Sequence, residues 1–170
     1  MKAIIRTCWQ VFLLKGAPQV FPKSWLLFGM VLVAYLLTDA VTFLAEGITG
    51  LSLLEQTLFD TGLQVLFFAL LLQAKSLLPR LNQTLQAWLG AGVFINLLSM
   101  PLNLADRFTH GAAGETLLFV LVVLLSSWGI LVMAHVLRHS LEIGLAFGFV
   151  ISVVYFFGSA MVMQSLFPAA

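Results

Sequence analysis

The chain has 170 residues, of which 61% are hydrophobic and only 9% carry a charge, and its net charge is +1. A soluble domain carries about 25% charged residues, so this chain has too little charge for a water-facing surface, and the bilayer is the solvent that suits it. The small net charge gives no field that would attract nucleic acid, and one cysteine, Cys8, excludes an intrachain disulfide.

Residues 1–23 are expected to form an amphipathic interfacial helix followed by a Pro-containing linker. Apolar side chains follow helical spacing on one side of the helix, and basic side chains lie on the other: Ile4, Ile5, Cys8, Trp9 and Phe12 against Lys2 and Arg6. This pattern favours a helix in the plane of the membrane surface. Lys15 cuts the apolar run short and no small-x-small cleavage site follows, so we expect the segment to stay in the mature protein.

Residues 24–170 are predicted to form one membrane domain with five spans. The first span, at about 1.5 Å per residue, reaches about 34 Å and crosses a hydrocarbon core of about 30 Å. Ser24 is placed to cap it, a capping-box spacing of Ser52 and Glu55 opens the second span, and Pro79 ends that span. The expected spans are approximately 24–46, 55–78, 84–105, 115–137 and 141–167. The predicted fold is therefore an all-α, polytopic membrane bundle of five transmembrane helices plus the N-terminal helix.

The charges predict how the bundle is oriented. If the N-terminus is cytoplasmic, only Arg107 among the eight Lys and Arg falls outside, and only Glu142 among the acids falls inside. Cytoplasmic loops carry an excess of Lys and Arg. The prediction is an integral protein of a bacterial inner membrane, with a cytoplasmic N-terminus and the C-terminus outside.

Polar side chains form stripes inside three of the spans. The first span carries a stripe at the spacing i, i+4, i+7, i+11, formed by Tyr35, Asp39, Thr42 and Glu46. The third span repeats this spacing with Gly92, Asn96, Ser99 and Asn103. In the second span, Asp60 and Gln64 share one face. Lipid offers these groups no hydrogen-bond partner. One interpretation is interhelical hydrogen bonding, worth about 0.6–2 kcal/mol for each bond. The other is a polar cleft open to the outer side, lined by Asp39, Asp60, Gln64 and Asn96.

The fifth span carries small residues at Gly144, Gly148, Ser152 and Ser159. Small residues let two helix backbones approach closely, so this face is expected to pack against another helix. The partner helix lies either in the same chain or in a second copy.

The only polar cluster in the last third of the chain is His135, Arg138, His139 and Glu142, spaced i, i+3, i+4, i+7. On an unbroken helix, two His and a Glu at this spacing would suit a transition metal. One helix over 115–167 would reach about 80 Å, so the chain must turn here, with Ser140 as the expected cap of the last span. The turn and the positive charge of Arg138 favour a solvated cytoplasmic hairpin without a metal.

Catalytic signatures are missing from the sequence. It contains no G-x-S-x-G, H-E-x-x-H or C-x-x-C pattern and no phosphate-binding glycine loop. We therefore expect no enzymatic activity and no cofactor.

The end of the chain resembles a known membrane family. The stretch Trp128–Ala146, WGILVMAHVLRHSLEIGLA, combines a bulky helix with a tight basic turn, and a charge-free span then runs to SLFPAA. These features, with five spans and a short outer C-terminus, resemble the Yip-domain family in a compact bacterial form. The Asp-Leu-Tyr-Gly-Pro type motif of its eukaryotic members is missing. The resemblance implies a membrane protein that is not a catalyst.

The leading functional hypothesis is a Yip-like, non-enzymatic accessory, scaffold or membrane-organising subunit that acts through helix–helix contacts. Its expected partners are the lipid bilayer and either other membrane proteins or further copies of itself. The alternative is a small transporter or channel subunit that uses the polar cleft, which would require oligomerisation because five spans are few for a pore. A third hypothesis, an intramembrane metalloenzyme at His135, His139 and Glu142, is the least favoured.

Overall fold

The computed structural model describes residues 2–109 and 111–167, and this part of the chain is all-α, with no strand. Its elements are α1 (Lys2–Phe12), the 3₁₀ turn η1 (Pro18–Val20), α2 (Trp25–Ala45), α3 (Leu51–Ala74), the 3₁₀ turn η2 (Leu78–Arg80), α4 (Leu81–Asp106), α5 (Ala112–Leu141) and α6 (Leu145–Leu166). The helices α2 to α6 are long and apolar enough to cross a membrane, so the chain is an integral membrane protein. The predicted all-α fold with five apolar spans is confirmed.

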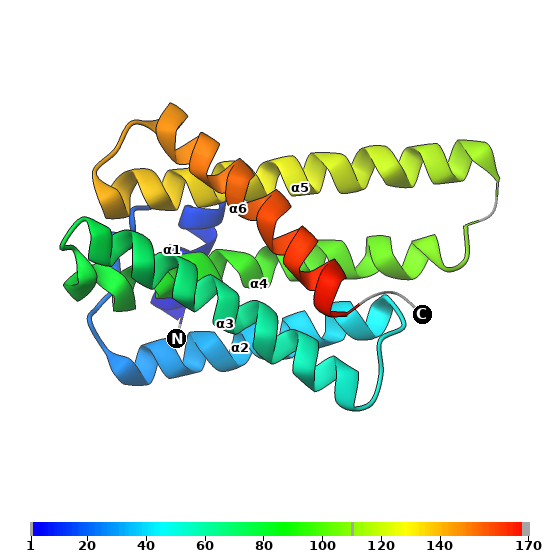
Figure 1. The fold of residues 1–170 in the computed structure, drawn as a ribbon, viewed down its shortest axis with the longest axis horizontal. Helices are drawn as coiled ribbons and strands as arrows, with labels where there is room; N and C mark the ends of the chain where they lie inside the picture. The colour runs from blue at the N-terminus through cyan, green and yellow to red at the C-terminus, as the bar shows by residue number, and fades with distance from the viewer. Residues whose placement is uncertain (1, 110, 168–170) are drawn as a thin grey trace.

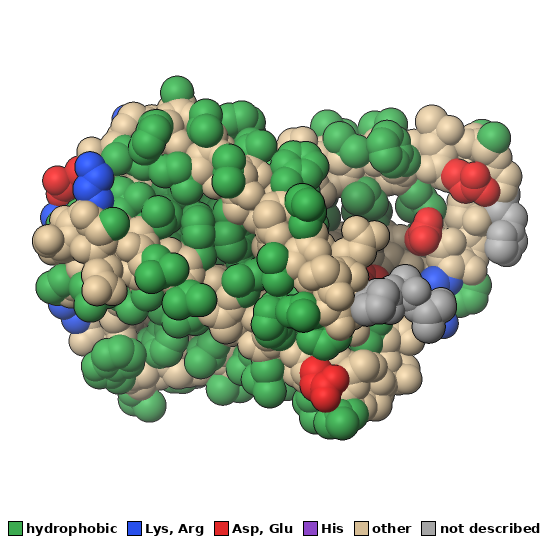
Figure 2. Space-filling view, viewed as in Figure 1, with side chains coloured by type: hydrophobic (Ala, Val, Ile, Leu, Met, Phe, Trp, Pro, Cys, Tyr) green, Lys and Arg blue, Asp and Glu red, His purple; other side chains and the backbone are tan. Residues whose placement is uncertain are grey.

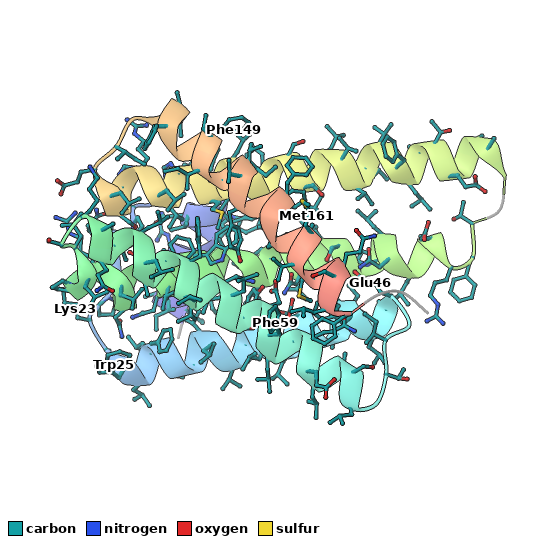
Figure 3. All side chains as sticks on the ribbon, viewed as in Figure 1. Lys23, Trp25, Glu46, Phe59, Phe149 and Met161 are labelled. Atoms are coloured by element: carbon teal, nitrogen blue, oxygen red, sulfur yellow. The ribbon has the colours of Figure 1, made fainter. Side chains whose placement is uncertain are left out.

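The five long helices alternate in direction, and α6 crosses the others obliquely (Figure 1). Positively charged side chains gather at one end of the bundle and most acidic ones at the other (Figure 2). Figure 3 shows Lys23 and Trp25 at the first end and Glu46 at the second. We call them the basic end, marked by Lys23, Lys75, Arg80 and Arg138, and the acidic end, marked by Glu46, Asp106 and Glu115.

The second span begins and ends earlier than the sequence predicts. α3 begins at Leu51 rather than Glu55, after Gly50 at φ +69°, a backbone angle that favours glycine. Ser52 therefore lies inside the helix, where its hydroxyl donates to the carbonyl oxygen of Thr49. At the other end, α3 stops at Ala74, and the expected last turn becomes a bend with Ser76 at φ +57°.

The turn between the last two spans is also placed differently. The expectation that Ser140 caps the last span is wrong, because α5 continues to Leu141 and Gly144 is the N-cap of α6. Glu142 takes left-handed backbone angles, φ 55° and ψ 46°, and so ends α5. Ser140 lies inside α5 instead, where its side-chain oxygen accepts a hydrogen bond from Thr84 at 3.0 Å.

The tightly packed core lies in the basic-end half of the bundle. Every residue over 83–92 except Trp88, and over 132–137, is buried. The linker contributes Phe21, which is 1% exposed. The acidic-end half of α5 is mostly exposed. The bundle is therefore closed at its basic end and open at its acidic end.

Helix α1 lies across the basic-end half of α4 (Figure 1). Its buried side presents Cys8 to Gly90, where a Cβ would come within 2.5 Å of the Cys8 sulfur. The ring of Trp9 meets Phe94 edge-on at 5.1 Å between centroids. The indole of Trp128 donates to the carbonyl oxygen of the last α1 residue at 3.2 Å. α1 is thus docked on the bundle, and its location at a membrane surface stays a prediction.

Candidate functional site

The polar stripes of α2 and α4 face each other. Both helices run from the basic end to the acidic end, so two stripes of equal spacing meet pair by pair. The ring of Tyr35 packs on Gly92, where a Cβ would come within 2.7 Å of the ring. One helical turn further on, the amide of Asn96 donates to the Asp39 carboxylate at 3.4 Å. The two stripes therefore form one interhelical ladder.

Gln64 of α3 connects this ladder to its neighbours. Its amide nitrogen donates to the Tyr35 hydroxyl at 2.6 Å and to the Asp60 carboxylate at 2.5 Å. Its amide oxygen accepts from the indole of Trp88 at 2.6 Å. The Tyr35 hydroxyl in turn donates to Asp60 at 3.3 Å. Gln64 is 5% exposed, so its polar groups are satisfied by protein from three helices.

These side chains border a cavity of about 370 Å³ between α2, α3, α4, α5 and α6, which we call the polar cleft. Three of the four residues that the sequence predicts for such a cleft line it, together with other polar groups: Asp60, Gln64 and Asn96, with Glu46, Asn103 and Tyr155. No Lys, Arg or His is among the described residues that line it. Three of the four predicted cleft residues are therefore brought together around one volume.

Asp39, the fourth predicted residue, lies one layer behind the cleft wall. Its side chain is 6% exposed, and one carboxylate oxygen takes the hydrogen bond from Asn96. The other oxygen has no hydrogen-bond partner in the described part of the chain. A buried carboxylate with a single neutral donor is an expensive arrangement in a low-dielectric interior.

The cleft continues toward the acidic end, where Figure 2 shows the molecule hollowed out. A second cavity of about 330 Å³ lies there, and Glu46 and Asn103 line both cavities. Asn103 donates to Glu46 at 2.8 Å, the last pair of the ladder. Asp106, Arg107 and Glu115 also line this outer cavity, which we call the vestibule. The mouth of the cleft is therefore acidic, with one arginine.

The cleft is suited to hydrogen bonding and charge compensation. Within the described ranges, no three His, Cys, Asp or Glu side chains come close enough together to hold a metal ion. Carboxylates, amides and hydroxyls on an apolar frame are the features that orient a small ligand in a binding site.

The predicted packing face of the last helix is used inside the chain. A Cβ at Gly148 would come within 2.9 Å of the backbone carbonyl oxygen of Ala134, so α6 touches the α5 backbone there. Ser152 is fully buried on the same side, and Ser159 lines the polar cleft. Gly144 has open space around its Cα and makes no such contact. The small residues thus give α6 its close approach to α5.

The polar cluster of the last third is only partly solvated. Contrary to a fully solvated hairpin, His135 is 8% exposed, because its imidazole Nε2 lies 2.8 Å from the carbonyl oxygen of Gly16 and the N-terminal linker covers it. The His135 and His139 rings lie 4.6 Å apart between centroids. Gln19 donates to the backbone carbonyl of His139 at 2.5 Å. Arg138 is exposed and makes no ion pair within the described residues.

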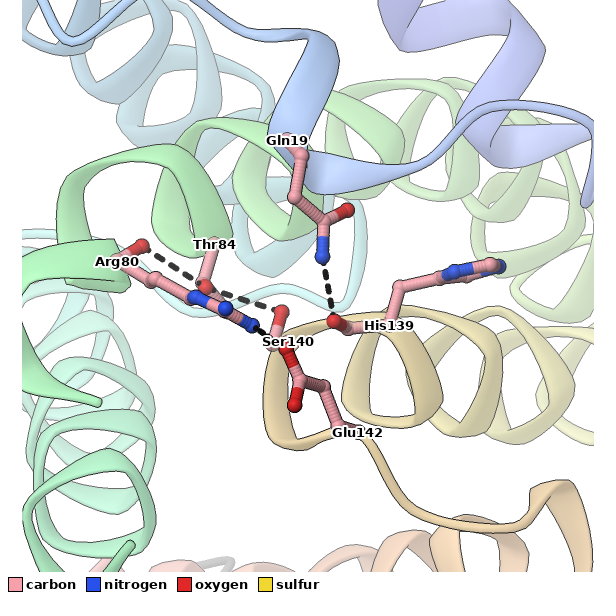
Figure 4. Close-up of polar contacts among 6 residues, drawn as sticks. All are labelled: Gln19, Arg80, Thr84, His139, Ser140 and Glu142. Atoms are coloured by element: carbon pink, nitrogen blue, oxygen red, sulfur yellow. Dashed lines mark hydrogen bonds and ion pairs between the residues drawn. The ribbon is translucent and has the colours of Figure 1, made fainter. Parts of the chain in front are cut away.

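Figure 4 shows how the same turn is held to α4. Arg80 forms an ion pair with Glu142 at 2.6 Å, and Thr84 donates to Ser140. Glu142 therefore faces an arginine rather than the two histidines. The four predicted hairpin residues are distributed between a buried contact, open solvent and this ion pair, so they do not converge on a metal site.

Two aromatic residues belong to the cleft in addition to the residues predicted for it. Trp88 donates to Gln64, and Tyr155 lines the cleft with its hydroxyl oxygen buried and unpartnered in the described structure. Trp88 lies four residues before Gly92 and so extends the α4 stripe by one turn. That spacing would have allowed Trp88 to be predicted as a cleft residue. No spacing in the sequence predicts that Tyr155 lines the cleft.

Comparison with family models, curated proteins and solved structures gives no match to this chain.

Proposed function

We propose that the chain is a non-enzymatic integral membrane protein whose polar cleft binds a solute, as a small transporter or channel subunit. The cavity of about 370 Å³ is the observation that carries this proposal. Polar groups whose only role is to join helices pack directly against one another without a cavity between them, because protein interiors leave few voids larger than a water molecule. Here the polar groups of five helices surround a volume and an acidic mouth leads to it.

The proposed orientation places the basic end in the cytoplasm and the acidic end outside. The charge separation between the two ends supports it, since cytoplasmic segments are rich in Lys and Arg. In this orientation the N-terminus is cytoplasmic, the cleft opens to the outside, and the bacterial inner membrane is the proposed location. The test labels intact cells with an impermeant maleimide, using single cysteines in a Cys8→Ser background. Thr49→Cys should react, and Gln73→Cys, exposed at the opposite end, should not.

The first test of the cleft is its access to water. Ser126 lines the cleft, whereas the next residue, Ser127, is exposed on the outer surface of α5. In a Cys8→Ser background, Ser126→Cys should react with a water-soluble sulfonated thiol reagent, and Ser127→Cys, which faces lipid, should react much more slowly. Equal rates for the two variants would argue against a water-accessible cleft.

The second test measures flux. The purified chain in proteoliposomes should move small solutes, and Asp39→Asn and Asp60→Asn should each slow that flux. Both substitutions keep the size of the side chain and remove its charge. Flux that is unaffected by both would show that the cleft is not the path.

A second candidate is the Yip-like accessory, scaffold or membrane-organising role, and membership of that family is itself a proposal. It is favoured by the acidic-end half of α5, where Leu117, Phe119 and Leu124 are each at least 60% exposed. Leu117 and Leu124 share one side of the helix and Phe119 points to the opposite side, so this half of α5 has few helix neighbours and offers room for a partner. Gentle purification followed by native mass spectrometry tests this role. A lone monomer without any partner would contradict it.

A further inference from the structure

Among the described residues, no Lys, Arg or His lines the polar cleft, and its carboxylates make no ion pair within 4 Å; Arg107 lines only the vestibule outside it. Asp60 receives hydrogen bonds from Gln64 and Tyr35, and Glu46 receives one from Asn103. All of these donors are neutral. Among the described residues, the only ion pair within 4 Å joins Arg80 to Glu142 at the opposite end of the bundle.

Neutral donors orient a carboxyl group but supply no positive charge that would compensate its ionised form. In a low-dielectric interior the ionised form is costly unless a positive group lies nearby. Asp39, 6% exposed and with one unpartnered oxygen, adds a third carboxylate directly behind the wall. A positively charged ligand in the cleft would offset the repulsion among these groups.

The walls of the cleft are aromatic as well as acidic. Tyr35, Trp88, Tyr155 and Phe156 all line it. Aromatic faces attract organic cations, and cages of such rings are a recurring way to bind quaternary ammonium groups. The hydroxyl oxygen of Tyr155 is buried there without a partner in the described structure.

The same walls do not form a transition-metal site. Such an ion needs several His, Cys, Asp or Glu ligands that converge on one point, and no group of three among residues 2–109 and 111–167 provides this. Apolar side chains such as Ile95, Leu125 and Met133 complete the wall. A volume of about 370 Å³ lies within the size range of small-molecule sites.

We propose that the polar cleft binds a small organic ammonium cation, with Asp60 and Glu46 supplying the charge and the aromatic side chains the contact surface. This inference rests on the proposed solute-binding role of the cleft and names the class of its solute. The ammonium group has two sources, a water-soluble amine that enters through the vestibule or the head group of a phospholipid that enters from the bilayer.

The test measures binding of choline to the full chain in nanodiscs by isothermal titration calorimetry. The matched neutral probe is 3,3-dimethylbutan-1-ol, which has the same shape without the charge. Choline should bind saturably, and the neutral probe should bind at least about tenfold more weakly. Asp60→Asn should weaken choline binding by a similar factor, whereas Glu55→Gln, an exposed position of the same helix outside the cleft, should not.

Glu46→Gln is the second variant, because Glu46 is exposed at the mouth and the glutamine oxygen can still accept the hydrogen bond from Asn103. It should also weaken choline binding, and circular dichroism confirms that each variant is folded. Discs of phosphatidylglycerol alone and discs containing phosphatidylethanolamine distinguish the two sources. Weaker choline binding in the second discs assigns the site to a lipid head group, and equal binding assigns it to a soluble amine.

The cation inference is overturned if choline does not bind, or if the neutral probe binds equally well. The thiol-labelling test on Ser126→Cys measures whether water reaches the cleft and does not depend on any ligand. A reactive Ser126→Cys with no choline binding would therefore overturn the ammonium assignment and leave the solute-binding role standing. An unreactive Ser126→Cys would count against both.

Discussion

Trp88 of α4 donates its indole N–H to the amide oxygen of Gln64 in α3 at 2.6 Å, while the amide nitrogen of Gln64 reaches Tyr35 of α2. One side chain thus joins three helices through polar contacts. Gln64 itself is 5% exposed, so a replacement leaves its partners without water to bind.

Gln64→Leu should lower the free energy of unfolding by about 1–3 kcal/mol, since it leaves the Trp88 N–H without an acceptor. Unfolding in mixed micelles with increasing sodium dodecyl sulfate measures this. Gln73→Leu, at an exposed position of the same helix, is the control and should have little effect. Trp88→Phe combined with Gln64→Leu should cost less than the two single changes added together, because both remove the same contact.

Gly148→Ala should destabilise the α5–α6 contact by about 1–3 kcal/mol, because its Cβ would lie 2.9 Å from a backbone oxygen that cannot rotate away. Gly158→Ala is the matched control on the same helix. No atom lies within 4 Å of its added Cβ, so the better helix propensity of alanine should make it neutral or stabilising by up to about 1 kcal/mol. Equal effects of the two changes on the unfolding curve would contradict the close crossing.

Cys8 should react slowly with N-ethylmaleimide while the protein is folded. Burial raises the pKa of the Cys8 thiol from 9.0 to about 11 and opposes formation of the reactive thiolate. Below pH 9 the thiolate fraction is then about 100-fold lower than for an exposed cysteine. The labelling rate should keep rising as the pH approaches 11. A Thr49→Cys, Cys8→Ser protein, labelled in parallel, should level off near pH 9.

Two contacts at the basic-end turn should differ in their contribution to stability. Thr84 is fully buried and Ser140 is 1% exposed, so Thr84→Val should cost about 1–2 kcal/mol by leaving a buried hydroxyl without its donor. Glu142 is 65% exposed, so Glu142→Gln should cost less than about 1 kcal/mol despite its 2.6 Å ion pair. Unfolding at low and high salt separates them, because only the effect of Glu142→Gln should shrink in salt.

The sequence predicts the parts of this molecule that depend on one helix at a time. The stripe that contains Asp39 and the stripe that contains Asn96 are visible because helical periodicity operates within a single span. The common direction of alternate spans lets two stripes of equal spacing pair in register, but the contact between α2 and α4 itself is a tertiary feature. The contact between Gln64 and Trp88 is tertiary as well. It depends on how far α3 rotates about its axis against α4, and side-chain packing across several helices sets that rotation.

The turn before the last span shows a second limit. Ser140 has the composition of a helix cap, and a local reading must choose between a cap and a helix interior. Its partner Thr84 lies 56 residues earlier, so the choice depends on a tertiary contact. The cover over His135 likewise comes from Gly16, 119 residues away.

The docking of α1 sets an order of events during synthesis. α1 leaves the ribosome first, but Trp128, which holds its last residue, is made 116 residues later. At roughly 5–20 residues per second, about 6–23 s pass between the synthesis of α1 and that of Trp128. Before α4 and α5 are in place, the apolar side of α1 needs another cover, and a lipid surface suits an amphipathic helix of this kind. Docking of α1 is therefore complete only after both helices have been made, and its time course would report when α4 and α5 have come together in the membrane.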